Sequence, residues 1–407
     1  MKKEIDLMLY PNTFLWINSQ SGIIYNSMVY SIFNFKLNPE IEFYCRQLTD
    51  TKNLYIAHIK NPSTDITNWI NEIITRNMGC LIKEDDLDIA VGFPPILNLQ
   101  ADVKRINEAQ DRSMGEFASQ NFNEISIYIG GISDHSEWYR QIPYPITSKD
   151  VLDFYDLKTF LLKYDSSYLN TINIIGDIPS YNYENDLIEL LNGFYAHKHI
   201  FINSYILSHS TDWTQRLDIE KTTIWLYYES KMSIETIKSY LFESDTPIKL
   251  VYPLLCDGQW KELERLKKTI GDENIIVKPI FQDNNKFFED NIYVNEDDFL
   301  GLTYDKQDIF AHQVMNTNFW GRLHIFPNGN VYSNVNHPPI GTLKNNLYDL
   351  IIEEMNSRRS WRWTRDCIPE CKECLYHYLC PSPSNYELVI GKYNLCHIWD
   401  KDKTHNK

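Results

Sequence analysis

The stretch Ile125-Ser126-Ile127-Tyr128-Ile129-Gly130-Gly131 decides the fold, because it has the pattern of a buried strand that ends in a glycine turn. Similar apolar runs recur downstream. The expected strands are Ile125–Ile129, Thr171–Ile175, His199–Tyr205, Thr222–Tyr228, Ile248–Leu254 and Ile275–Ile280. Six such strands separated by crossovers predict an α/β fold with a parallel sheet and outer helices, either an open doubly wound sheet or a partial barrel.

Helical segments are expected in the crossovers between these strands. They lie near Asp150–Leu162, Asp186–Phe194, Ser233–Leu241 and Gln259–Ile270, and a polar connection is expected after His199–Tyr205. In parallel α/β folds, ligands bind at the carboxyl ends of the strands. We therefore expect any chemistry of this region in the loops that follow the six strands.

The composition indicates a globular chain with more than one domain. It has 407 residues, of which 43% are hydrophobic and 14% aromatic, enough for two or three packed cores. The formal charge of -16 disfavours nucleic acid and anionic membranes as partners. No apolar run approaches the ~20 residues of a membrane span, and the chain does not start like a signal peptide. These features predict a cytoplasmic protein without a membrane or nucleic-acid partner.

The two ends of the chain differ in pattern from the middle. The first ninety residues have the pattern of a small α+β unit, with helical periodicity after Pro39 and Ser63. Its expected strands are Phe14–Asn18, Ile23–Tyr25, Tyr30–Phe35 and Leu54–Ile59. Near the other end, Leu323–Phe326 and Val331–Tyr332 predict a hairpin. Ser357–Trp363 is basic and aromatic, and we interpret it as a helix that packs its tryptophans beside a metal site.

That metal site is indicated by the uneven distribution of eight cysteines. Cys45, Cys80 and Cys256 are isolated among apolar residues and are interpreted as small buried hydrophobes. The other five lie in one terminal stretch, at Cys367, Cys371, Cys374, Cys380 and Cys396. In a reducing compartment such crowding favours metal ligation over disulfides.

Four of the five provide a complete ligand set, namely Cys371, Cys374, Cys380 and Cys396. Four thiolates suit either a tetrahedral zinc ion or a cysteine-ligated iron–sulfur cluster. A zinc ribbon that only stabilises a small region is the simpler interpretation. Cys367 is a fifth candidate that either replaces one ligand or takes no part.

The stretch from Gly321 to Cys396 resembles a SPASM domain, the auxiliary-cluster domain of radical SAM enzymes that modify peptides. The family's central Cys-x2-Cys-x5-Cys pattern is matched at Cys371, Cys374 and Cys380, and its last cysteine at Cys396. The resemblance implies one four-cysteine site and favours a [4Fe-4S] cluster over zinc.

The sequence lacks three cysteines of the family pattern, because none stands upstream of the hairpin and two more are replaced. Asn334 stands at the cysteine position of the hairpin, and Ser384 stands at the fourth position of the central pattern. In the family the missing cysteines serve mainly a first auxiliary cluster. The resemblance therefore implies that only the second cluster site is retained.

The middle region resembles the radical SAM partial (β/α)6 barrel. After the second expected strand, Gly176-Asp177-Ile178-Pro179 is similar to a degenerate form of the family's Gly-Gly-Glu-Pro motif, so Gly176, Asp177 and Pro179 are weak candidates for binding S-adenosylmethionine. A plain turn between strand and helix explains the same residues. The loop Gly130–Arg140 lacks the Cys-x3-Cys-x2-Cys motif that holds the cofactor-cleaving cluster in the family. Without those thiolates the cluster has no ligands, so S-adenosylmethionine is not expected as a cofactor.

The N-terminal unit loosely resembles a small winged-helix-like domain that binds leader peptides by adding a strand to its sheet. Such capture uses the main chain of an edge strand, for which Tyr30–Phe35 is the candidate. The expected domains are 1–92, a peptide-recognition-like α+β domain; 93–120, a connecting segment; 121–300, a degenerate radical SAM-like partial barrel; and 310–402, a SPASM-like cluster domain.

As a whole the chain resembles a pseudo-radical SAM protein of bacterial peptide-modification systems. The resemblance implies a non-catalytic scaffold that binds a precursor peptide of ribosomal origin or docks on an active radical SAM partner enzyme. The alternative is an active peptide-modifying enzyme that uses the C-terminal cluster directly or an altered S-adenosylmethionine site. The absence of thiols from the first-strand loop favours the scaffold.

Overall fold

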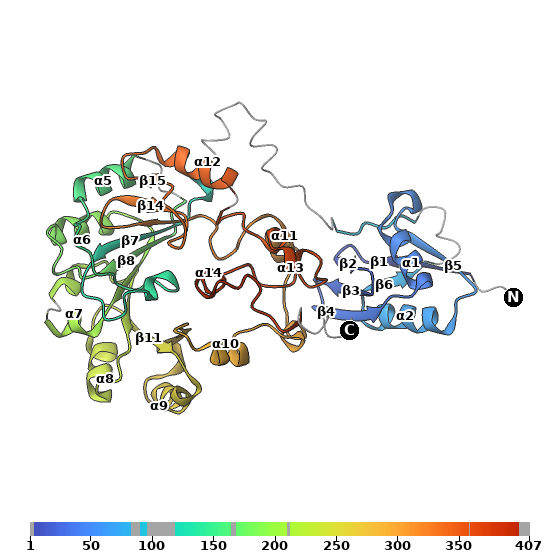
Figure 1. Ribbon diagram of the computed structural model, residues 1–407, viewed down its shortest axis with the longest axis horizontal. Coiled ribbons are helices and arrows are strands. Elements are labelled where there is room, and N and C mark those ends of the chain that lie inside the picture. The colour runs from blue at the N-terminus through green and yellow to red at the C-terminus, as the bar shows by residue number, and fades with distance from the viewer. Residues whose placement is uncertain are drawn as a thin grey trace.

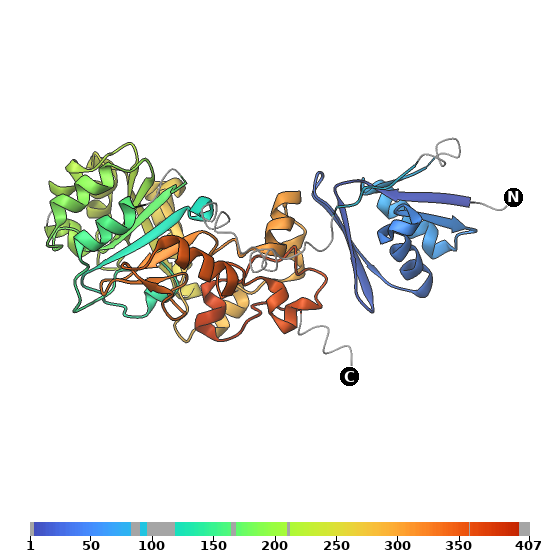
Figure 2. The same cartoon turned by 90° about the horizontal axis from the view of Figure 1, so that it is seen from above.

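The computed structural model describes residues 4–82, 90–95, 119–163, 168–209, 212–357 and 359–398. Most of the expected connecting segment 93–120, and the expected C-terminal domain beyond residue 398, lie outside these ranges. Figures 1 and 2 show an elongated molecule, with the N-terminal unit at one end and a larger α/β unit at the other. No helix in the described ranges is long and apolar enough to cross a membrane.

The N-terminal unit contains two small antiparallel sheets and two helices. One sheet has the order β5-β1-β6, from β1 (Glu4–Leu9), β5 (Ile56–Lys60) and β6 (Gly79–Leu81). The other is a meander of β2 (Thr13–Ile17), β3 (Ser21–Asn26) and β4 (Ser31–Lys36). The helices are α1 (Pro39–Thr49) and α2 (Thr64–Thr75). All four expected strands are present, and β1 and β6 are additional.

Local sequence accounts for the start of both helices. The side chain of Asn38 accepts a hydrogen bond from the Ile41 amide and thereby caps α1, which begins with Pro39. Ser63 caps α2 in the same way, through the amide of Ile66. Both helices pack against one face of the meander, where Leu15 and Ile24 are buried. The opposite face of the meander is also apolar, and it packs against residues of the C-terminal half of the chain.

The larger unit is built on six parallel strands that neighbour one another in chain order. They are β7 (Glu124–Gly130), β8 (Thr171–Gly176), β9 (His197–Ile202), β10 (Thr222–Tyr227), β11 (Ile248–Leu254) and β12 (Ile275–Pro279). A doubly wound sheet reverses its strand order at a switch point, and this sheet does not. The parallel α/β sheet is confirmed, and its order is that of a partial barrel.

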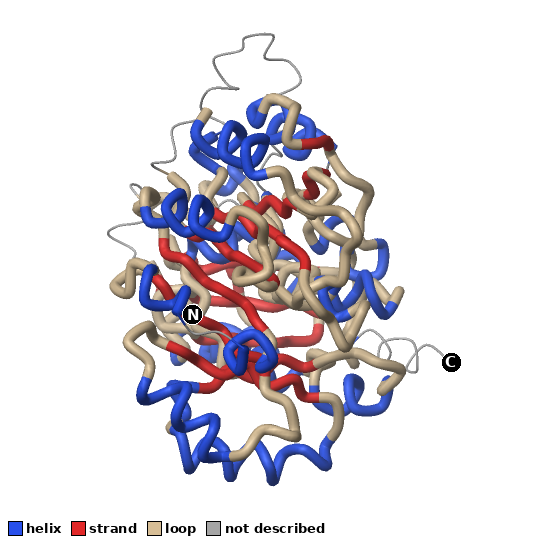
Figure 3. Tube along the Cα trace, turned by 90° about the vertical axis from the view of Figure 1, so that its left-hand side faces the viewer, coloured by secondary structure: helices blue, strands red, loops and turns tan. Residues whose placement is uncertain are grey.

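Helices fill the crossovers between these strands. They are α5 (Phe154–Leu162), α6 (Glu184–Asn192), α7 (Ser204–His209), α8 (Ile234–Glu243) and α9 (Trp260–Ile270), and a further helix, α10 (Asn285–Asn291), follows β12. Helix α7 stands where a polar connection was expected after β9. Its residues Ile206 and Leu207 are buried in the main core. The segment is too short to show a helical period in the sequence. Figure 3 shows the strands in the middle of the unit with helices around them.

The expected hairpin extends this sheet. Strand β13 (Arg322–Ile325) pairs in parallel with β7, and β14 (Asn330–Tyr332) and β15 (Gly341–Thr342) continue in antiparallel fashion. The sheet therefore has nine strands, in the order β12-β11-β10-β9-β8-β7-β13-β14-β15. Helix α11 (Lys306–Val314) precedes the hairpin, and α12 (Leu347–Ser357) follows it.

The helix expected over Ser357–Trp363 is wrong in the described residues, because α12 ends at Ser357. The buried carboxylate of Glu354 accepts hydrogen bonds from the amides of Ser360 and Trp361, both at 2.9 Å. These bonds hold the chain in a turn that places Trp361 in the main core. The remaining helices, α13 (Pro369–Lys372) and α14 (Asn385–Ile390), belong to the cysteine region.

The two faces of the parallel sheet have different covers. Side chains at alternate positions, such as Ile127, Ile174 and Ile224, pack beneath the outer helices in the main core. The intervening positions, such as Tyr128, Phe201 and Tyr227, point to the inner face and belong to separate aromatic clusters. The inner face corresponds to the interior of a barrel, and a parallel α/β fold places its ligand at the carboxyl ends of these strands.

Candidate metal centre

Four cysteines line one cavity in the C-terminal region, and they are the four that the sequence selects. Cys371 lies on α13, and the amide of Cys374 donates to the carbonyl of Cys371 at 2.9 Å, closing the turn between them. The next turn is closed by the Cys380 amide on the Tyr376 carbonyl at 2.7 Å. Cys396 reaches the same cavity from the far end of the chain.

A short parallel bridge holds Cys396 in place. Val294 pairs with Cys396, the Val294 amide donates to the Leu395 carbonyl at 2.9 Å, and the His397 amide donates to the Val294 carbonyl at 2.9 Å. Val294 also lines the cavity. The fourth cysteine is therefore positioned by the segment that links the barrel to the cysteine region.

Burial controls the protonation of these thiols. It raises the pKa of Cys371 to about 11, and those of Cys374 and Cys380 to about 12. At neutral pH these three groups are therefore neutral thiols unless a cation compensates the charge of their thiolates. A metal ion supplies that compensation, so binding is coupled to the release of protons.

Zinc and a [4Fe-4S] cluster require different arrangements of their donors. Among the described residues, no three His, Cys, Asp or Glu side chains converge as ligands of one metal ion. Zinc requires such convergence, with each sulfur about 2.3 Å from the ion. A [4Fe-4S] cluster instead takes each thiolate on a different iron, so its four donors surround a space. The four cysteines line a cavity of about 30 Å³, which would have to widen to take a cluster.

A buried arginine supplies positive charge beside the cavity. Arg365 pairs with Glu387 at 2.9 Å, and both side chains are less than a tenth exposed. Its Nε donates to the Pro381 carbonyl at 2.8 Å. Burial opposes the charge of the guanidinium, but Cys380, Glu387 and Cys371 outweigh this effect and raise the pKa of Arg365. Arg365 thus stabilises negative charge on two of the four cysteines.

Cys367 does not line the cavity. It is exposed, and its Sγ lies 3.6 Å from the carbonyl oxygen of Arg362. Of the three isolated cysteines, Cys45 is buried as expected, whereas Cys80 is partly exposed and Cys256 is exposed. For Cys256 the interpretation as a buried hydrophobe is therefore wrong.

Hydrogen bonds connect the two positions at which family cysteines are replaced to the surrounding chain. The side-chain Nδ2 of Asn334 donates to the side-chain Oδ1 of Asn385 at 2.8 Å, and that oxygen also accepts from the Nδ2 of Asn336 at 3.2 Å. The hydroxyl and the backbone amide of Ser384, the N-cap of α14, both donate to Glu387, its capping-box partner in the first turn of the helix. Because Glu387 also binds Arg365, this polar network is continuous with the wall of the cysteine cavity.

The residues similar to an S-adenosylmethionine motif form a tight turn at the end of β8. Gly176 has φ +133°, and a Cβ there would lie 2.0 Å from the carbonyl oxygen of Gly130. The carboxylate of Asp177 accepts hydrogen bonds from the amide and hydroxyl of Ser180, at 3.2 and 2.7 Å. Gly176 and Asp177 therefore have a structural explanation in the turn, which continues through Pro179.

The β7–α5 loop, residues 131–153, covers the inner face of the sheet. Trp138 and Tyr144 from the loop are buried in one cluster with Tyr227 and Val251 from the strands. The Tyr144 ring lies 5.0 Å from the ring of Trp138 and 4.7 Å from that of Tyr227, both edge-on. Such aromatic pairs add about 0.5–1.5 kcal/mol each beyond their buried area.

Hydrogen bonds at the carboxyl ends of three strands anchor this loop. After β9, the side-chain Nδ2 of Asn203 donates to the carbonyl of Ile132 at 3.1 Å. At the end of β10, the Tyr227 hydroxyl donates to the Pro143 carbonyl. After β12, Gln141 exchanges two hydrogen bonds with the main chain of Phe281, at 2.9 and 2.7 Å. The loop is thus fixed at the position where a parallel α/β fold holds its ligand.

Sequence reasoning missed several residues around the cysteines. His377 and Asn394 line the cavity, and Arg365 borders it. His377 stands between Cys374 and Cys380 in the sequence, so its position in the motif could have predicted that it lines the cavity. Arg365 had none, because its partners Pro381, Glu387 and Tyr393 are 16–28 residues away in the chain.

Comparison with known proteins gives remote structural likenesses. No protein-family model and no curated protein sequence matches the chain. Streptococcus suis SuiB bound to the precursor peptide SuiA is 13% identical, with 97% of this chain and 99% of that chain covered and a TM-score of 0.42. SuiB bound to S-adenosylmethionine is 12% identical, with 96% of this chain and 99% of that chain covered and a TM-score of 0.39. BtrN in an open conformation is 11% identical, with 62% of this chain and 92% of that chain covered and a TM-score of 0.27. With TM-scores below 0.5, none of these likenesses identifies the activity of the chain.

Proposed function

We propose that the protein is a non-catalytic component of a peptide-modification system, a pseudo-radical SAM protein with a SPASM-like cluster domain. It binds a precursor peptide and presents it to an active radical SAM partner enzyme. Its four cysteines Cys371, Cys374, Cys380 and Cys396 hold one [4Fe-4S] cluster, which stabilises the C-terminal region. Cofactor cleavage is left to the partner.

The β7–α5 loop is the observation that carries this proposal. In the family that the sequence resembles, the loop after the first strand holds the cofactor-cleaving cluster. Here the loop has no cysteine, and its aromatic side chains pack against the inner face of the sheet. A reactive site would need thiolates and open space at this position, and the chain places Trp138, Ile142 and Tyr144 there.

The peptide-binding part of the proposal is supported by strand β4. It lies at the edge of the β2-β3-β4 meander and has no strand on its outer side among the described residues. An extended peptide that pairs with such an edge gains main-chain hydrogen bonds whatever its sequence. The candidate stretch Tyr30–Phe35 covers most of β4, although Tyr30 itself lies in the preceding turn with φ 53°.

Anaerobic reconstitution with iron and sulfide tests both parts of the cluster proposal. We expect iron and sulfide to bind in the amount of one [4Fe-4S] cluster per chain. We also expect no reductive cleavage of S-adenosylmethionine above that of a sample without cluster. Cleavage above this background would refute the non-catalytic assignment and favour an active enzyme. Zinc in the native protein would refute the cluster and leave the scaffold role intact.

A further inference from the structure

We propose that the bound peptide runs from the free end of β4 into a groove that shares a wall with the cysteine cavity. The peptide and the four cysteines then form one composite site. This inference rests on the proposed peptide-binding function and adds the path of the peptide. The peptide is an uncharged, extended segment. It meets the cysteine centre, and it does not enter the interior of the barrel.

The groove lies between the N-terminal meander and the cysteine region. It has a volume of about 310 Å³, at the lower end of the range of ligand pockets. One wall is formed by the β2–β3 turn and by the last residues of β4, Asn34 to Lys36. The other wall includes Cys374, Leu375 and Tyr376.

Hydrogen bonds on both sides of β4 show which main-chain groups are free. The Leu37 amide donates to the Gln20 carbonyl at 2.8 Å, so odd-numbered residues point their main-chain groups toward β3. Even-numbered residues therefore point outward. At Ile32 the outward carbonyl accepts from the Arg76 side chain at 3.1 Å. The outward groups of Asn34 and Lys36 have no partner among the described residues, and these are the residues that line the groove.

Arg76 limits the edge that a peptide can use. Its guanidinium lies 5.5 Å from the centre of the Phe33 ring and also pairs with Glu72 at 2.8 Å. A side chain placed in this way covers the first half of the strand against a pairing partner. Only the half of β4 beside the groove, with Asn34 and Lys36, leaves its outward main-chain groups accessible to a pairing strand. An added peptide strand therefore pairs with this half alone.

The groove and the cysteine cavity share a wall. Cys374, Tyr376 and Ile398 line both of them. The Tyr376 hydroxyl also accepts a hydrogen bond from the side chain of Asn34 at 2.7 Å, joining β4 to the cysteine turn. A peptide seated beside Lys36 therefore lies next to the turn that carries one of the four thiols.

The chemistry of the lining identifies the kind of ligand. The walls contribute amide and hydroxyl side chains at Asn18, Gln20, Ser21 and Asn34, with one cation at Lys36 and one carboxylate at Glu296. Such a lining pairs with the alternating donors and acceptors of a polypeptide main chain. Two opposite charges give no net preference for an acidic or a basic ligand. An uncharged extended segment fits this surface.

The test uses the full-length protein with dodecapeptides selected on it from a displayed random library. Lys36→Pro removes the outward N–H of residue 36 and leaves the side of β4 that pairs with β3 intact. Lys36→Ala is the matched control, since it removes the side chain and keeps the N–H. We expect Lys36→Pro to weaken peptide binding about tenfold and Lys36→Ala to change it less than about twofold. Ser21 lies beside Lys36 in the same wall, and Ser21→Tyr fills the groove with a larger side chain, so it replaces Lys36→Pro if that variant does not fold.

A photoreactive group at one end of the selected peptide tests the contact with the cysteine region. We expect the label on the segment that contains Leu375 and Tyr376. Equal binding to all variants, or a label on strands β7–β12, would overturn the path proposed for the peptide and leave peptide binding itself established. If no peptide binds the full-length protein, the proposed peptide-binding function fails together with this path.

Discussion

Arg365 shows how a single side chain can connect the metal centre to its surroundings. Its charge lies beside Cys371 and Cys380, and its other bonds reach Glu387 and the carbonyls of Pro381 and Tyr393. The proposed [4Fe-4S] cluster with four thiolates would carry net negative charge, which the buried guanidinium of Arg365 would compensate. Removing one member of a buried ion pair costs about 3–5 kcal/mol, because the other charge is then buried alone. The buried pair of Arg365 and Glu387 therefore contributes to stability whether or not the cavity holds a metal.

At the residue scale, Cys374→Ser and Cys367→Ser form a matched pair of substitutions. We expect Cys374→Ser to lose most of the bound metal and to lower the melting temperature of the C-terminal region, since ligation contributes folding free energy. Cys367→Ser should leave both unchanged, because Cys367 lies outside the cavity. Metal analysis of each variant and calorimetry check this. Equal metal content in the two variants would contradict the assigned ligands.

Strand β13 is the element that joins the C-terminal region to the barrel. Its residues Arg322–Ile325 pair with Glu124–Ile127 of β7, and Arg322 forms an ion pair with Glu124 at 3.1 Å. This parallel pairing places His324 on the inner side, with its ring 6.5 Å from that of Tyr128. The Nδ1 atom of His324 is buried without a hydrogen-bond partner in the described residues. The strand therefore carries a histidine, His324, whose protonated form is disfavoured by burial.

At the element scale, His324 makes stability depend on pH. Burial lowers its pKa to about 3, so the folded protein keeps the ring neutral while the unfolded chain takes up a proton near pH 6.5. The stabilisation is fully present above about pH 6.5, decreases as the pH falls below that value, and is lost completely near pH 3. As the pH falls below about 6.5, we expect the unfolding free energy of His324→Phe to decrease less steeply than that of the wild-type protein. The two slopes should differ by up to about 1.4 kcal/mol per pH unit.

Denaturant unfolding at several pH values between 4 and 7 measures this difference. The other buried histidines, such as His199 and His312, contribute equally to both proteins and cancel in the comparison. Parallel pH profiles for the two proteins would show that His324 is protonated in the folded state.

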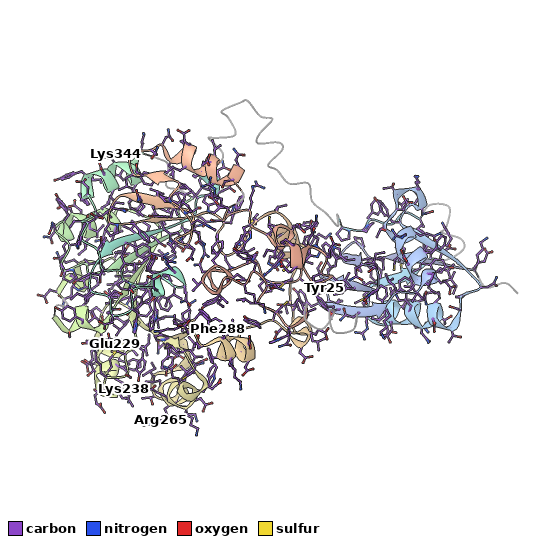
Figure 4. All side chains as sticks on the ribbon, in the orientation of Figure 1. Tyr25, Glu229, Lys238, Arg265, Phe288 and Lys344 are labelled. Atoms are coloured by element: carbon purple, nitrogen blue, oxygen red, sulfur yellow. The ribbon has the colours of Figure 1, made fainter. Side chains whose placement is uncertain are left out.

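The whole molecule is held together by the second face of the meander. Phe14, Trp16, Ile23 and Tyr25 from this face pack in one cluster with Phe299, Ile309, Tyr378, Leu379 and Ile398 from the C-terminal half. The Tyr25 hydroxyl donates to the Tyr304 carbonyl at 2.8 Å, and Figure 4 shows Tyr25 at the junction of the two parts. The N-terminal unit therefore covers the cysteine region, and its docking also forms one side of the groove.

At the molecular scale, Ile23→Ala and Ile24→Ala separate docking from folding of the N-terminal unit. The two residues are neighbours in β3 and fully buried, but Ile23 faces the cysteine region and Ile24 faces the helices of its own unit. Each substitution should cost about 2–5 kcal/mol. We expect Ile23→Ala to speed hydrogen exchange in residues 371–380, and Ile24→Ala to speed it in α1 and α2. The same exchange pattern in both variants would contradict a docked interface.

Local patterns in the sequence determined most elements of the molecule. The six parallel strands follow from short apolar runs separated by amphipathic segments, and the helix starts follow from capping residues such as Asn38 and Ser63. The four thiols of the cavity follow from the spacing of cysteines in one stretch. These features depend on contacts between residues close in the chain, which is why they are visible without a structure.

Only the tertiary structure decided how these elements meet. The pairing of β13 with β7 joins residues about 200 positions apart, and the docking of the meander joins Tyr25 to Tyr304 across 279 positions. The β7–α5 loop reads as an ordinary polar connection until Trp138 and Tyr144 are seen against the inner face. Residue periodicity carries no information on which distant apolar face covers which, because burial depends on the packing of the whole chain.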